Sequence, residues 1–258
     1  MTGNNFAQIV NLTDAANKTG CQRMLAQRAA WASFAVGMAI WVPKAPSMMR
    51  QSMTQLDRQL IELKAFSPTP EIKGIHCEME AVWRKCRTAL IGQILKRYAA
   101  RSLIDIDNQL LLLDKKGASA LEQMVDKPTS KLVNVAGPQR GLSKRVDKLY
   151  LAMAWKAPIN AAQTEMSAAR ADFSASLDLR CTAPESTAQI KEGPDQTRIQ
   201  WVSCDSALTL KAGESAAPER GANAFTSSEN VLRRDGKTDG HVRARGRLKK
   251  PQSNSVRR

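Results

Sequence analysis

The stretch NKTGCQRMLAQR, residues 17–28, returns later in the chain as NVAGPQRGLSKR, residues 134–145. The offset is 117 residues, and six of the twelve aligned positions are identical. Further matches follow at an offset of 118, where five residues of the first half recur in the second: Ile72, Lys73, Trp83, Cys86 and Leu90 match Ile190, Lys191, Trp201, Cys204 and Leu208. Because two distant blocks keep nearly one offset, we interpret the chain as a tandem duplication. We expect one unit over residues 1–126, a second over 127–250 and a basic tail over 251–258.

The composition predicts an all-α fold for both units. Of the 258 residues 43% are hydrophobic but only 5% are aromatic, and the long segments are rich in Ala, Leu, Met, Gln, Lys and Arg, which favour helices. No run of alternating β-branched residues is long enough to predict a sheet. We therefore expect two tandem, pseudo-repeated units that each resemble a four-helix bundle.

Prolines, glycines and apolar spacing predict where the helices lie. In unit one we expect the first helix to end before Pro43 and Pro46, and the last to stop near Gly117. In unit two, Pro138 lies inside the repeated stretch, so we expect Asn134 to precede the helix. The expected helices cover about 6–42, 47–65, 71–90 and 102–113, then 138–155, 160–179 and a stretch through residue 201. The apolar run 29–42 is too short to span a bilayer and predicts a buried helix.

Charge is concentrated at the end of the chain. The protein carries 39 Lys plus Arg against 24 Asp plus Glu, a formal net charge of +15, and residues 231–258 hold ten of the basic residues and two Asp. Glycines at 236, 240 and 246 weaken a final helix there, so we expect poor order. Such a cluster can bind a polyanion by releasing its counterions. This supports the alternative reading of a basic protein associated with nucleic acid or an acidic surface, although a solvated tail is the simpler interpretation.

The chain lacks the residues of common catalytic and metal sites. Only two histidines occur, His76 and His241, and the five cysteines form no C-x-x-C pair. A histidine triad, a zinc site and a dense disulfide framework are therefore not expected, although a single disulfide would be compatible. We expect neither an enzyme nor a cofactor or metal. The W-x-x-C pairs at Trp83 and Trp201 are typical of a buried helix face.

The repeated stretch places polar residues on one side of a helix. At 100° per residue, Gly20, Arg23 and Gln27 share one stripe, while Asn17, Gly20, Met24 and Arg28 lie on an adjoining one, so that Gly20 stands where the two meet. The glycine permits close approach of another helix. A planar guanidinium at such a seam can donate two hydrogen bonds to a carboxylate or a planar oxyanion.

At these residues the chain resembles a known family. Residues 14–28 and 132–145 are similar to the N-A-G-x-x-R-M-x-S-x-R box of the NarX/PilJ-type sensor domain, found in nitrate- and nitrite-responsive sensor kinases and in type IV pilus methyl-accepting chemotaxis transducers. Further resemblance lies in YLAMAW after the second box, in PEIKGIHCEMEAVW at 70–83 and in AFTSSENVL at 224–232. The ordered set covers most of the chain and is more specific than the box alone.

The resemblance implies a non-catalytic four-helix bundle that senses a small anion such as nitrate or nitrite. The box arginine that contacts the ligand corresponds to Arg23 in unit one and Arg140 in unit two. The other candidate ligand residues are Asn17, Gly20, Gln27, Arg28, Gly137 and Arg145. In sensor dimers of this family the ligand lies between two symmetry-related box helices, and a tandem chain can place both boxes together. The second box departs from the pattern, with Gly141 in place of Met24 and Lys144 in place of Gln27.

The resemblance also implies a periplasmic location and signalling through a partner protein. The first residues, MTGNNFAQIVNLTD, lack the basic and apolar regions of a secretory signal, so we expect a cytoplasmic location instead if Met1 is the true start. We expect no transmembrane segment and no main role in binding nucleic acid. The sequence alone names neither the anion nor the partner.

Overall fold

The computed structural model describes residues 9–41, 44–91, 94–124, 128–182, 188–209, 215–226 and 229, with backbone only for 128–138, 140, 180–182 and 188–196. The described residues are all-α and contain no strand, which confirms the all-α part of the predicted fold. The first half of the chain contains α1 (Leu12–Gly37), α2 (Lys44–Phe66), α3 (Pro70–Ile91), the 3-10 turn η1 (Arg97–Ala99) and α4 (Ala100–Gln123). The second half contains α5 (Pro128–Ala154), α6 (Ala162–Thr182), α7 (Ala188–Leu208) and a short helix over 218–226. The tail over 231–258, expected to be poorly ordered, lies outside the described residues.

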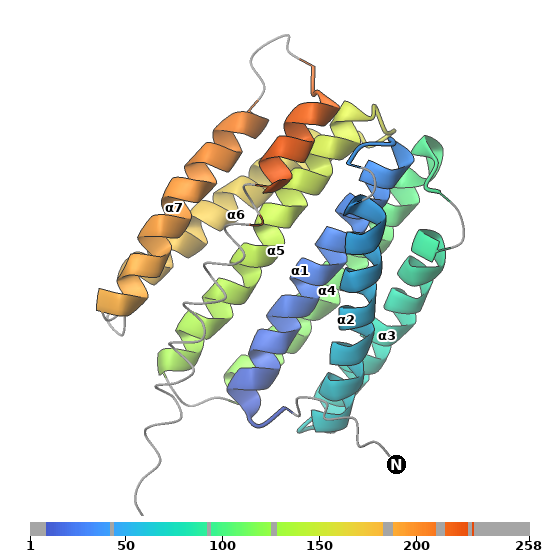
Figure 1. The fold of residues 1–258 in the computed structure, drawn as a ribbon. Helices are drawn as coiled ribbons and strands as arrows, with labels where there is room; N and C mark the ends of the chain where they lie inside the picture. Colours follow the sequence, from blue (N-terminus) through green and yellow to red (C-terminus); the bar gives the residue numbers. More distant parts are fainter. Residues whose placement is uncertain are drawn as a thin grey trace, which may run out of the picture.

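The helices form two groups that meet at α1 and α5 (Figure 1). In the first group α1 packs against α2 and α4, and α3 completes the group by packing against α2 and α4. In the second group α5 packs against α6 and α7. The most extensive helix–helix contact in the protein joins α1 to α5. The two helices that carry the repeated stretch therefore lie side by side in the middle of the molecule.

The helices of the two groups follow one another at a nearly constant spacing. A shift of 118 residues places α2 over α6 and α3 over α7. The short helix begins at residue 218, again 118 residues after α4 begins at Ala100.

The first helices of the two groups also end in the same turn. Ala39 and Lys156, 117 residues apart, both adopt left-handed backbone conformations, with φ of 55° and 53°. Beside them, Ile40 N donates to Ala35 O at 2.9 Å, and Ala157 N donates to Ala152 O at 3.0 Å. This 6→1 bond is the Schellman ending of a helix. The likeness of the two halves therefore extends to a turn in which few residues are identical.

The core is continuous from one group of helices to the other. The middle of α1 is buried on every side, including Trp31, Phe34 and the alanines between 29 and 35, as expected of a helix surrounded by other helices. Trp83 and Trp201 are both buried, as the sequence predicts. Trp83 donates a hydrogen bond from Nε1 to Asp57 of α2 at 2.6 Å, and Trp201 stacks on Phe173 of α6 with ring centroids 3.9 Å apart. None of the described helices is long and apolar enough to cross a membrane.

The predicted break at Pro138 is wrong. α5 is helical from Pro128 through Pro138 to Ala154, so Asn134 lies on the helix rather than before it. A proline inside a helix removes one backbone donor and costs about 3 kcal/mol by propensity. The extensive packing of α5 on α1 and α6 accounts for its persistence, because tertiary contacts commonly override local propensity.

Three other predicted helix bounds are also wrong. α1 ends at Gly37, before the expected 42, and α2 begins at Lys44, so Pro46 lies in its first turn, where a missing backbone donor costs little. α4 continues through Gly117 to Gln123 instead of stopping. A Cβ at Gly117 would lie 3.5 Å from Ile75 Cγ2, an ordinary van der Waals distance, so this glycine faces α3 without requiring a missing side chain.

Candidate functional site

Arg23 lies where the two central helices meet. Its side chain crosses α5 at Gly141, where an added Cβ would stand 2.9 Å from Arg23 Cγ and 3.0 Å from Cδ. Real Cβ atoms do not approach this closely, so the path of Arg23 requires a glycine at position 141. The sequence comparison treats Gly141 as a departure from Met24 of the first box. In the structure that departure makes room for the arginine.

The guanidinium of Arg23 has no protein partner among the described residues. Its Nε is buried and makes no hydrogen bond, and Arg23 forms no ion pair within 4 Å. Burial lowers the pKa of Arg23, whereas the negative charges of Asp114 and Glu122 raise it. The side chain remains partly accessible to solvent. An arginine in this state can donate hydrogen bonds to a small oxyanion.

Two further polar side chains of this region are buried. Gln22, next to Arg23, is 1% exposed, and neither its Nε2 nor its Oε1 makes a hydrogen bond. Asp114 of α4 is 2% exposed, and its Oδ1 accepts no hydrogen bond. Buried polar groups almost always have partners, so such groups point to a bound molecule or to water.

The sequence prediction did not include Asp114, although a signal for it exists. The buried face of α4 repeats every three or four residues and has acidic residues at two of its positions, seven residues apart: Leu103, Asp107, Leu110, Asp114, Gly117 and Leu121. An aspartate on such an apolar stripe is costly to bury without a partner or a function. That position therefore distinguishes Asp114 from an ordinary surface aspartate.

Two further arginines of the boxes, Arg28 and Arg145, are already paired within the protein. Arg28 donates to both carboxylate oxygens of Glu229, at 3.2 and 3.1 Å, and to Ser52 Oγ at 3.2 Å. Arg145 pairs with Glu165 at 2.7 Å. These contacts neutralise both charges, whereas Arg23 is left without such a partner.

The remaining predicted ligand residues occupy α1 and α5. Asn17 and Gly20 are buried on α1, and Gln27 is buried with its Nε2 donating to Asp107 Oδ2 at 2.7 Å. Gly137 and Arg140 lie on α5, but their surroundings and the separation of the Arg23 and Arg140 guanidiniums lie outside what the structure describes. The structure therefore brings the two boxes together as helices, and a ligand role for these residues stays a prediction.

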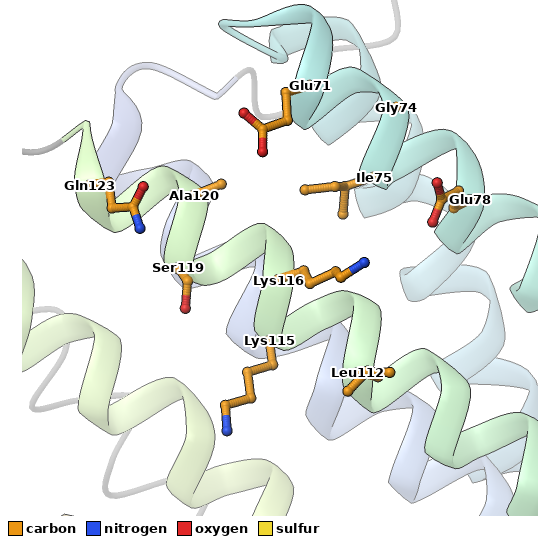
Figure 2. Close-up of a pocket in the computed structure, with 10 residues that line it drawn as sticks. All are labelled: Glu71, Gly74, Ile75, Glu78, Leu112, Lys115, Lys116, Ser119, Ala120 and Gln123. Atoms are coloured by element: carbon orange, nitrogen blue, oxygen red, sulfur yellow. The ribbon is translucent and has the colours of Figure 1, made fainter.

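A surface groove elsewhere offers less for an anion. It has a volume of about 560 Å³ and lies between α3 and α4 (Figure 2). Its charged lining residues are two acids of α3, Glu71 and Glu78, and two bases of α4, Lys115 and Lys116. Figure 2 shows Lys116 extending toward α3 and Lys115 turned away from it. Because opposite charges line it in equal number, the groove has no clear preference for a negative ligand.

The described residues include no group of three or more His, Cys, Asp or Glu arranged to hold a metal. Cys21, Cys77, Cys86 and Cys204 are not in disulfides. In comparisons with known proteins no family model matches the chain, and neither a curated protein nor a solved structure is similar enough to count as a match.

Proposed function

We propose that this protein binds a small oxyanion of the nitrate or nitrite type at the seam between α1 and α5, with Arg23 as the residue that contacts it. One observation carries the proposal: a partly buried guanidinium between the two box helices whose Nε has no protein partner. Leaving a buried donor unsatisfied costs about 1–3 kcal/mol, so a bound anion would remove a penalty present in the empty protein. The resemblance to the NarX/PilJ-type sensor domain supports the choice of anion.

We propose that the fold that supports this function consists of two copies of one sensor unit. Two four-helix-bundle-like units, over about 1–126 and 127–250, would replace the two subunits of a sensor dimer by a pseudo-two-fold axis within one chain. The constant helix spacing, the repeated Schellman turn and the contact between α1 and α5 support this proposal. The protein would act without catalysis and pass its signal to a partner protein, in the periplasm if the resemblance holds for location.

Calorimetric titration with sodium nitrate tests the proposal. The unmodified protein should bind nitrate saturably, and Arg23→Ala should abolish binding at little cost in stability. Arg23→Lys should also fail, because an ammonium cannot reproduce the planar pair of donors. The control is Arg101→Ala, which removes the same charge from an exposed position on α4 and should leave the affinity unchanged. Unchanged affinity in either Arg23 variant would contradict the assignment.

The basic stretch over 231–258 favours a second candidate function, binding to nucleic acid or to an acidic surface. Salt-dependent retention on DNA-cellulose that disappears when the residues after Val231 are removed would support it. Nitrate binding that survives the same truncation would separate the two functions.

A further inference from the structure

Asp114 gives the proposed anion site a second charged group, and this inference rests on the proposed function. We propose that Asp114 is the resident counter-charge of Arg23 and must be neutralised by a proton before an anion can take its place, so that nitrate binds together with one proton taken up by the Asp114 carboxylate. The site would then respond to pH as well as to the anion.

The geometry gives the first reason. Asp114 on α4 and Arg23 on α1 interact electrostatically, and α1 and α4 pack directly against each other. Both side chains are described, yet they form no hydrogen bond and no ion pair within 4 Å. Each keeps a buried atom without a partner, Oδ1 in Asp114 and Nε in Arg23. A guanidinium and a carboxylate that served only as a structural pair would form the usual forked contact.

The balance of charge gives the second reason. With Asp114 ionised, its negative charge cancels the field of Arg23 and repels an anion. With Asp114 protonated, the positive charge of Arg23 is opposed by the exposed Glu122 but no longer by the buried Asp114, and the carboxylic acid can donate a hydrogen bond. One guanidinium and one neutral acid together balance a single negative charge. Because an unbalanced charge is costly to bury, the anion and the proton should enter together.

The surroundings of Asp114 make it the group that titrates near neutral pH. Burial raises its pKa to about 7, with Arg23 lowering it and Asp107 of the same helix raising it. From α3, His76 faces this part of α4: its Nε2 would be 3.9 Å from a Cβ at Gly117, one turn along the helix from Asp114. Burial lowers the pKa of His76 to about 4, so it is neutral at pH 7.

The other charged groups around this part of α4 have partners or act on Arg23. Lys148 of α5 pairs with Asp107, so its charge is compensated there. Glu122, on the last turn of α4, acts on Arg23. Arg97 of η1 lies at the opposite end of α4 from Glu122. Of the groups named here, Asp114 is the one whose pKa burial raises to about 7.

Calorimetry with sodium nitrate from pH 5.5 to 8.5 tests this inference. The Kd of the unmodified protein should be nearly constant below pH 6 and should rise about tenfold between pH 6.5 and 8, since only the protonated form binds. At pH 8, titrations in HEPES and in Tris, which differ in ionisation enthalpy, should report uptake of nearly one proton per nitrate. Asp114→Asn keeps the shape and a hydrogen-bond donor, and should bind nitrate at pH 8 as tightly as the unmodified protein does at pH 6.

The control is Asp105→Asn, which changes an exposed aspartate on the same helix and should keep the pH profile of the unmodified protein. Nitrate binding with a pH-independent Kd and no proton uptake would overturn the inference while leaving the proposed function intact. A pH profile that persists in Asp114→Asn would overturn it as well. If the unmodified protein binds no nitrate at any pH in this range, the proposed function fails and the inference fails with it.

Discussion

Lys148 of α5 forms an ion pair with Asp107 of α4 in the interior of the protein, where neither side chain is exposed to solvent. Positions 148 and 107 correspond, by offsets of 117 and 118, to Trp31 and Phe225. Those two residues also touch each other, with stacked rings whose centroids are 3.6 Å apart. In each case a residue on the first helix of one half contacts the last helix of the other half. The equivalent contact is thus ionic between α5 and α4 and aromatic between α1 and the short helix.

Removing one partner of the Lys148–Asp107 ion pair should strongly destabilise the protein. Lys148→Met leaves Asp107 charged and buried, and we expect it to lower the free energy of unfolding by about 3–5 kcal/mol. The double variant Lys148→Met/Asp107→Leu should recover part of this loss, because apolar side chains can replace a buried pair, while Gln27 Nε2 loses its acceptor. Urea denaturation followed by circular dichroism measures both. Arg101→Ala, which breaks an exposed pair with Asp105, should cost less than about 1 kcal/mol. A double variant no more stable than Lys148→Met would refute this reading.

Gly141 should be needed for the position of Arg23. In Gly141→Ala the new Cβ would overlap Arg23 Cγ, so the arginine must leave its path or α5 must shift. We expect a net loss of about 1–2 kcal/mol in stability, since overpacking outweighs the gain in helix propensity. Nitrate affinity should fall at least about tenfold if Arg23 must keep its place to hold the anion.

The matched control for Gly141→Ala is Gly74→Ala on α3, where an added Cβ meets nothing within 4 Å. This variant should gain up to about 1 kcal/mol, because alanine favours a helix over glycine, and its nitrate affinity should not change. Thermal unfolding and calorimetry on both variants provide the comparison. Equal stability and equal affinity in the two would mean that Gly141 imposes no constraint on Arg23.

Proline, glycine and capping residues in the sequence predict some of the helix starts and ends correctly. Pro70 and Glu71 mark the start of a helix, and α3 begins at Pro70. The predictions fail at Pro138 and Gly117, where the helix continues through a residue that normally ends it. Both residues lie on helices that pack against other helices. The free energy gained from that packing cannot be inferred from a short stretch of sequence.

The candidate site was only partly predictable for a related reason. The repeat singles out Arg23, because equal spacing of Gly, Gln and Arg in two distant stretches is visible in the sequence alone. The repeat also includes Arg28 and Arg145, yet their glutamate partners lie on other helices and become apparent only in three dimensions. Asp114 lies outside the repeated stretch, and its relation to Arg23 depends on how α4 packs on α1.

His76 should make the stability of the protein fall at mildly acidic pH. It is 1% exposed, its Nδ1 lies 2.8 Å from Ser67 Oγ, and its Nε2 is buried without a partner. Burial lowers its pKa from 6.5 to about 4 in the folded protein. Between these values the unfolded chain binds a proton that the folded protein does not. The stabilisation is therefore complete above pH 6.5 and is lost as the pH falls toward 4.

His76→Asn keeps a donor for Ser67 and removes the titration. The difference in unfolding free energy between the unmodified protein and this variant should be constant above pH 7 and should shrink by about 3 kcal/mol between pH 6.5 and 4. Asp114→Asn provides a control of opposite sign. Burial raises the pKa of Asp114 to about 7. The free energy of unfolding of the unmodified protein, relative to that of Asp114→Asn, should therefore increase as the pH falls from 7 toward 4. Urea denaturation at each pH measures both differences in unfolding free energy. If the difference for His76→Asn does not change with pH, His76 is protonated as readily in the folded protein as in the unfolded chain.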